Sequence, residues 1–331
     1  MRKLSLVLLI VGVTLVIGLV AWRGVGAVTD VLGIAGWRLL WMAAYYTLSL
    51  IMTALAWWCL FPPSERPSLP LVVFVQWVGQ SINTLLPAAQ IGGEVAKARL
   101  IIHKGISTTL AAASVVVHTT VRSAAQILIA LLGVALLARQ AGGDDWIPAL
   151  LSVSAILGVL IYIFYRVQQA GLFQLIARVA KRLSPGLPLD RWIGGAEALE
   201  AGIRDLYRRV WAVAISCALR VVARLLIAGE VWLALYLMGH PITRVEALLL
   251  ETLNQTMRAA AFLVPGSYGV QDGGYVLVGL LIGLAPEVAL ALALAIRARE
   301  FILGIPALLA WEFVEGRVLL HGNKHIPRNP D

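Results

Sequence analysis

The chain has 331 residues, of which 60% are hydrophobic and 14% are charged, and its formal net charge is +9. Soluble domains average roughly 25% charged residues, so this composition excludes an ordinary soluble protein. In a membrane protein, an excess of basic residues indicates which loops face the cytoplasm, so we interpret the positive net charge as a signal of orientation. We expect no nucleic-acid partner. Cys59 and Cys217 lie far apart in apolar runs, so they predict neither a disulfide nor a metal site, and no cofactor is expected.

Six segments are predicted to cross the bilayer, because roughly 20 apolar helical residues span its core. The first run follows Arg2 and Lys3 as a secretory signal would, but it is longer than the roughly 7–15 apolar residues of a cleaved signal. We therefore expect it to be retained as the first span. The six predicted spans, in chain order, are 4–22, 37–61, 107–138, 147–165, 210–238 and 287–314.

Basic residues set the predicted orientation of these spans. The long polar stretch 166–209 is rich in arginine and lysine and is therefore expected on the cytoplasmic side. The basic chain ends agree, so both termini are predicted to be cytoplasmic, with the loop 139–146 outside. The stretch 166–209 is also amphipathic, and it either lies on anionic lipid headgroups or is a solvated connector.

Two further apolar segments, 71–102 and 245–284, do not fit this orientation as simple crossings of the membrane. Each must enter the membrane and leave it on the same side. Each contains a proline, Pro87 or Pro265, that ends or kinks a helix. A carboxylate follows each proline by seven residues, Glu94 in the first segment and Asp272 in the second. We predict two re-entrant broken-helix hairpins; packing kinks with glycines for close helix contact are the plain alternative.

An arginine also follows each proline at nearly the same interval, Arg122 in the first half and Arg299 in the second. Each half supplies three crossings, an odd number, so the halves should lie upside down relative to each other. The predicted fold is an all-α polytopic membrane protein, with about six transmembrane helices plus two re-entrant hairpins in an inverted repeat. The predicted domains are 1–139 and 147–316, with the connector 166–209 and a cytoplasmic tail 317–331.

Polar side chains recur at helical spacing inside the apolar segments. Ionisable groups at that depth cost at least about 2.5–3.5 kcal/mol each and usually face a partner, a cavity or a pathway. Arginine binds phosphate or carboxylate bidentately, so a lipid headgroup is the predicted ligand. The same side chains could instead pair with one another, and a hydrogen-bonded structural role is the alternative for His118. The predicted substrate-binding residues are Asn83, Glu94, Arg122, Arg258, Asp272, Arg299 and Glu300, with Gln80, His118, Arg220, Arg224, Glu251 and Gln255 as secondary members.

Around the two breaks the sequence resembles a known family. Asn83-x3-Pro87-x4-Gly92-Gly93-Glu94, the segment 262–275 and Glu251-x3-Gln255-x2-Arg258-x3-Phe262 look like the lysylphosphatidylglycerol synthase transmembrane (flippase-like) family, and within it the HpnL-type proteins associated with hopanoid biosynthesis. That family usually has glutamate where this chain has Asp272. The resemblance implies a bacterial inner-membrane protein that moves or handles lipids. The synthase activity of the family belongs to a separate soluble domain, so we do not expect it in these residues.

The leading hypothesis is a lipid translocase that is not an enzyme. The headgroup of a hopanoid intermediate or an anionic phospholipid would enter between the repeats, and hopanoid-biosynthesis enzymes are further expected partners. A rival is a lipid-pyrophosphate phosphatase, because Pro265-Gly266-Ser267 is similar to a Pro-Gly-x-Ser-Arg loop, although the Ser-Arg pair is missing. A non-transporting scaffold for lipid synthesis is the third hypothesis.

Overall fold

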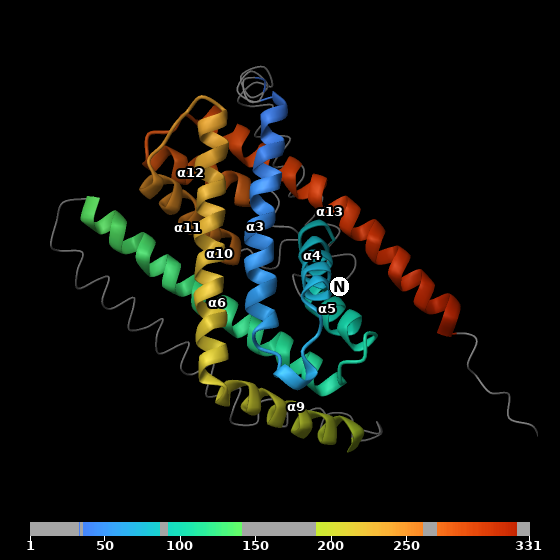
Figure 1. Cartoon of the computed structure of the whole chain (residues 1–331). Helices are drawn as coiled ribbons and strands as arrows, with labels where there is room; N and C mark the ends of the chain where they lie inside the picture. The colour runs from blue at the N-terminus through green and yellow to red at the C-terminus, as the bar shows by residue number, and fades with distance from the viewer. Residues whose placement is uncertain (1–32, 34–35, 87–91, 141–189, 261–269, 323–331) are drawn as a thin grey trace, which may run out of the picture.

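The computed structural model describes residues 33, 36–86, 92–140, 190–260 and 270–322 (Figure 1). All regular structure in these residues is helical, which confirms the predicted all-α class. Several sequence-based predictions lie outside the described residues. They concern the spans 4–22 and 147–165, the prolines Pro87 and Pro265, and most of the connector and the tail.

Two series of helices with the same order make up most of the described chain: a long helix, two short helices and a second long helix. The first series is α3 (Leu39–Trp58), α4 (Leu69–Leu85), α5 (Gly92–Ile102) and α6 (Thr108–Gln140). The second series is α10 (Val210–Leu237), α11 (Arg244–Ala260), α12 (Val270–Leu281) and α13 (Pro286–Gly322). The remaining elements are η1 (Gly36–Arg38), η2 (Pro63–Glu65) and α9 (Asp190–Arg208).

One sequence spacing relates the two series. The first residues of α6 and α13 are 178 positions apart (286 − 108), and Pro87 and Pro265 have the same spacing in the sequence (265 − 87). This spacing pairs Glu94 with Asp272, as the sequence predicts. It pairs Arg122 with Glu300, however, so the predicted match of Arg122 with Arg299 is one residue out of register. The second series therefore has an acid where the first has a base.

Corresponding helices run in opposite directions. In Figure 1, α3 descends from the top of the view while α10, which packs against it, rises from the bottom. Contacts between the series are reciprocal, because α4 packs on α13 and α11 packs on α6. Two repeats related by a pseudo-two-fold axis make reciprocal contacts of this kind, and the inverted repeat stays a prediction.

Three described helices are long and apolar enough to cross a membrane: Gly36–Trp58, Thr108–Gly133 and Val210–Leu237. They correspond to the predicted spans 37–61, 107–138 and 210–238. The predicted span 287–314 lies in α13, which has 37 residues but is not among these three helices. Charged residues at positions 297, 299 and 300 interrupt its apolar character.

Each series is held together largely by its own apolar core. In the second series, Leu235, Leu250 and Leu290 are among the fully buried side chains of one cluster. In the first series, Trp57 and Ile101 belong to the other. Large apolar side chains also remain exposed along α10 and the second half of α13, as expected for a surface that meets lipid.

The helix α9 lies across the lower ends of the long helices in Figure 1 and packs on α6. Its apolar residues Leu199, Ile203 and Leu206 join the core of the first series, while Arg204 and Arg208 are exposed. The apolar face of this part of the connector is thus covered by protein. Residues 166–189 of the connector lie outside the described residues, so both interpretations of this stretch stay predictions.

The first hairpin closes at two glycines. A Cβ atom added to Gly93 of α5 would clash with the carbonyl oxygen of Gly79 of α4. The backbone N–H of Gly93 also donates to Oδ1 of Asn83 at 2.8 Å, which satisfies a group that lacks a partner within the first turn of a helix. Glycine for close helix contact, the plain alternative from the sequence, therefore accounts for Gly93.

We expect Gly93→Ala to destabilise the protein by roughly 1–3 kcal/mol, the range for overpacking a filled site, because the methyl group would meet the backbone of α4 as well as the Asn83 side chain. The matched control is Gly273→Ala in α12, where nothing lies within 4 Å of the added carbon. Thermal unfolding of both purified variants in detergent measures the difference. Equal melting temperatures would contradict this close approach.

Candidate functional site

A polar cavity of about 370 Å³ lies where the two helix series meet. Its wall includes residues of α3, α4, α6, α10, α11, α12 and α13, so both hairpins contribute. This volume falls within the usual range of small-molecule sites, roughly 300–1,000 Å³. Nine of the predicted site residues line it: Gln80, Asn83, Arg122, Arg220, Arg224, Glu251, Gln255, Arg299 and Glu300.

Glu94, Asp272 and His118 are described and do not line the cavity. Glu94 contacts the lining residue Arg122, and Asp272 is 1% exposed and contacts Arg297 of α13. His118 is buried beside Trp57, with the two ring centroids 5.9 Å apart, and its Nδ1 has no hydrogen-bond partner among the described residues, so the hydrogen-bonded structural role stays a prediction. Arg258 lies in α11, but its side chain is outside the described part of the chain.

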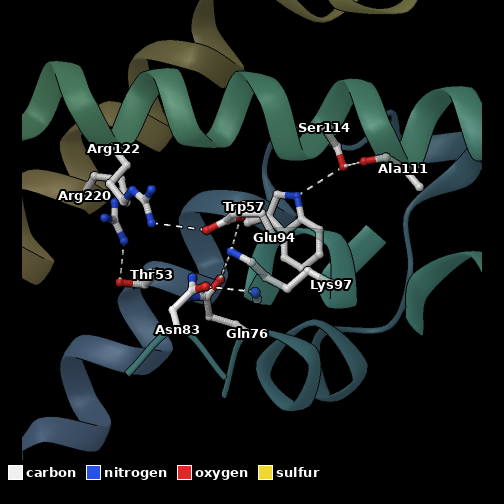
Figure 2. A network of polar contacts seen from close by, with 11 residues as sticks. Thr53, Trp57, Gln76, Asn83, Glu94, Lys97, Ala111, Ser114, Arg122 and Arg220 are labelled. Atoms are coloured by element: carbon white, nitrogen blue, oxygen red, sulfur yellow. Dashed lines mark hydrogen bonds and ion pairs between the residues drawn. The ribbon is translucent and has the colours of Figure 1, made fainter. Parts of the chain in front are cut away.

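Glu94 of α5 contacts two cations (Figure 2). Its Oε1 lies 3.1 Å from Nη1 of Arg122 on α6, and its Oε2 lies 2.7 Å from Nζ of Lys97. Lys97 is 2% exposed and also donates to Oε1 of Gln76 at 3.2 Å. A buried ammonium needs such partners, because removing it from water without them is costly. We call Lys97, Arg122 and Arg220, together with Glu94, the basic cluster.

Arg220 of α10 completes the basic cluster. It is 6% exposed, and its Nη1 donates to Oγ1 of Thr53 on α3 at 2.8 Å (Figure 2). Its Nε has no hydrogen-bond partner among the described residues, and no described carboxylate is within ion-pair distance of it. A neutral hydroxyl therefore orients this cation but does not neutralise it.

The second series contributes an acidic cluster, which we define as Glu230, Glu251, Asp272 and Glu300 with Arg224, Arg297 and Arg299. Arg297 bridges two of its acids, with Nη1 2.8 Å from Oε2 of Glu300 and Nε 3.3 Å from Oδ1 of Asp272. In the first series a base of α6 contacts the acid of α5. In the second series Arg297, which is on α13, contacts both the acid of α12 and a second acid on α13.

The rest of the acidic cluster joins α10, α11 and α13. Nε of Arg299 lies 2.9 Å from Oε1 of Glu230, and its guanidinium stacks 3.9 Å from the ring centre of Tyr46. Glu251 accepts a hydrogen bond from the Tyr275 hydroxyl at 3.2 Å and lies 3.8 Å from Nη1 of Arg224. These contacts hold five helices, α3, α10, α11, α12 and α13, at the cavity wall.

The two clusters make the described cavity electrically asymmetric. The basic cluster has three cations for one acid, whereas the acidic cluster has four acids for three cations. Charge–charge interactions are stronger in a protein interior than in water, so this imbalance acts on any ligand that enters. An anionic group is attracted toward the basic cluster.

Sequence reasoning did not select Lys97, Tyr275, Arg297 or Glu230 for the site. Lys97 follows Glu94 by three positions, a spacing that places two helical residues on one face, and this signal could have identified it. Tyr275 follows Asp272 at the same spacing. Glu230 has no such local signal, because its partner Arg299 is distant in sequence.

Comparison with protein-family models matches residues 9–307 to the lysylphosphatidylglycerol synthase TM region. The matched range contains both helix series up to Ala307 in α13, and every described residue of the cavity wall. Neither the curated proteins nor the solved structures gave a match to the chain.

We expect Glu94→Gln to destabilise the protein by roughly 3–5 kcal/mol, the range for breaking a buried ion pair, because it leaves the Lys97 ammonium without a carboxylate. The double variant Glu94→Gln, Lys97→Met removes both charges and should recover most of this loss. Thermal unfolding in detergent measures both effects.

Asp205→Asn is the matched control, since it breaks an ion pair of 3.5 Å with Arg208 that is largely exposed on α9, and it should change the melting temperature little. A double variant as unstable as the single one would contradict this account of the pair.

Proposed function

The chain belongs to the lysylphosphatidylglycerol synthase TM region family, and on this premise we propose that it is a lipid translocase of the bacterial inner membrane. The family makes it a membrane protein with a lipid-related function. The observation that carries the finer proposal is the polar cavity, whose wall holds ionisable side chains from both helix series. Such groups in membrane helices are costly, and they mark ligand pathways more often than they mark packing.

The chemistry of the cavity fits a lipid headgroup. The apolar core of a bilayer opposes the crossing of a charged headgroup, because burying an unpaired charge is costly. A cavity lined by arginine, glutamate and amide side chains replaces water around the headgroup, while the acyl or polycyclic tail stays in lipid. The exposed apolar side chains of α10 and α13 provide a surface for that tail.

The arrangement of the hairpins supports alternating access. In inverted-repeat transporters, one repeat moves against the other around a site near the membrane midplane. Here the contacts of α4 with α13 and of α11 with α6 are the two equivalent interfaces that could open in turn. We therefore propose that 71–102 and 245–284 are re-entrant hairpins, and that both chain termini are cytoplasmic.

The proposed cargo is a hopanoid intermediate or an anionic phospholipid, as the HpnL-type resemblance implies, and hopanoid-biosynthesis enzymes are the proposed partners. We further propose that the chain moves its lipid without changing it chemically. Release of inorganic phosphate from a lipid pyrophosphate by the purified protein would instead favour the phosphatase hypothesis.

Ser123→Trp should abolish lipid movement. Ser123 of α6 is exposed in the cavity wall and bonds only to the Thr119 carbonyl of its own helix among the described residues, so a large side chain there narrows the cavity with little effect on packing. Transbilayer movement of fluorescent phosphatidylglycerol in proteoliposomes measures the effect. The rate should fall to that of protein-free liposomes.

The matched control is Leu128→Trp, an exposed position on the same helix that does not line the cavity, and it should keep the wild-type rate. Equal rates with and without wild-type protein would overturn the translocase. Equal rates in the two variants would show that lipid does not pass through this cavity.

A further inference from the structure

Arg220 differs from the other arginines that are at least nine-tenths buried in the described helices. Arg297 and Arg299 each contact a carboxylate within 3.3 Å, whereas the hydrogen bond from Nη1 of Arg220 goes to the neutral hydroxyl of Thr53. Its Nε is buried and has no hydrogen-bond partner in the described part of the chain. A guanidinium buried in this way is costly unless an anion joins it, and Arg220 lines the cavity.

Arg122 is the second unusual arginine of the wall. Its side chain is 32% exposed, more than those of Arg224, Arg297 and Arg299 in their ion pairs. One of its nitrogens contacts Glu94, and that carboxylate is shared with Lys97. A guanidinium has five N–H donors, so Arg122 retains donors for a ligand in the cavity.

We propose that Arg122 and Arg220 form a subsite for a phosphate or phosphodiester group, and that this anion displaces Glu94 from Arg122. Guanidinium groups bind phosphate oxygens in bidentate geometry, and a phosphate presents enough oxygens for two of them. Thr53 orients Arg220 toward the site through its hydroxyl. The inference rests on the proposed function for the source of the anion, which is a lipid headgroup.

The displacement follows from how Glu94 is shared. When an anion takes its place on Arg122, Glu94 keeps its contact of 2.7 Å with Lys97, so no carboxylate is left unpaired. The contact between Glu94 and Arg122 joins α5 of the first hairpin to α6. Binding of the anion therefore releases the hairpin from α6, which links cargo recognition to movement of the hairpin.

Binding to the purified full-length chain in detergent tests the subsite. Short-chain phosphatidylglycerol is the lipid probe, inorganic phosphate is the soluble probe, and short-chain diacylglycerol is the uncharged control. Arg220→Gln should weaken the binding of phosphatidylglycerol by roughly tenfold or more, as expected for a charge-assisted contact. Arg208→Gln on the exposed face of α9 is the matched control and should leave binding unchanged.

Melting temperatures separate a ligand site from a structural role for Arg220. Removal of an uncompensated buried cation should leave the ligand-free melting temperature unchanged or raise it, while the increase caused by phosphatidylglycerol should disappear. A lower ligand-free melting temperature, together with an unchanged increase on adding the lipid, would overturn the subsite. If Arg220→Gln does not yield folded protein, Arg220→Lys supplies the test, and it should weaken binding because it loses the bidentate geometry.

Glu94→Gln tests the displacement. This variant should bind phosphatidylglycerol several-fold more tightly than the wild type, because no internal carboxylate competes for Arg122. Weaker or equal binding would overturn the displacement.

The two probes identify the source of the anion. A lipid-movement assay then tests the proposed translocase independently of the proposed subsite. Arg220-dependent binding of phosphatidylglycerol alone supports a lipid headgroup, and the same dependence for inorganic phosphate supports a soluble phosphate compound. Arg220-dependent binding without any lipid movement would overturn the translocase and keep the subsite. Unchanged lipid movement and binding in Arg220→Gln would overturn the subsite alone.

Discussion

A charged side chain in the apolar interior of a membrane protein must have a partner, and this requirement governs the described bundle. Lys97 lies where Glu94 and Gln76 can reach it, and Arg297 lies between two carboxylates. Such pairs add little net stability, but breaking one is strongly unfavourable. They therefore fix where the hairpins lie against the long helices, and they decide which cations remain available to a ligand.

The two helix series share an architecture but not a charge pattern. At equivalent positions the first has Glu94 and Arg122, and the second has Asp272 and Glu300. Each acid of a hairpin contacts an arginine of the following long helix, Arg122 or Arg297, but Arg297 also contacts the acid Glu300. As a result the cavity has a basic side and an acidic side. In the proposed translocase, this asymmetry makes the two halves of the transport cycle energetically unequal, because the headgroup is exposed to a different electrostatic field near each hairpin.

Much of the candidate site could be predicted because polar residues stand out against apolar helices. Gln80, Asn83 and Arg122 of the cavity wall belong to polar stripes at helical spacing within segments that are otherwise apolar. The partners were harder to predict, since one position along a helix turns a side chain by about 100°. Asp272 thus contacts Arg297 and not Arg299, which turns instead toward Glu230 of α10. Likewise, nothing local in the sequence indicates that α9 packs on α6.

The sequence by itself determined the helical class, the membrane environment, the family and the matching acids of the two hairpins. The class, the environment and the acids follow from composition, from the length of apolar runs and from spacing along one chain, whereas the family follows from the resemblance of the motifs at the two breaks; all of these are local properties. Tertiary structure alone decided which charges meet, because ion pairs such as Glu230 with Arg299 join residues from distant parts of the chain. It also decided that Arg220 lies in the cavity wall beside Thr53 and has no described carboxylate as a partner. That position depends on how α10 packs on α3.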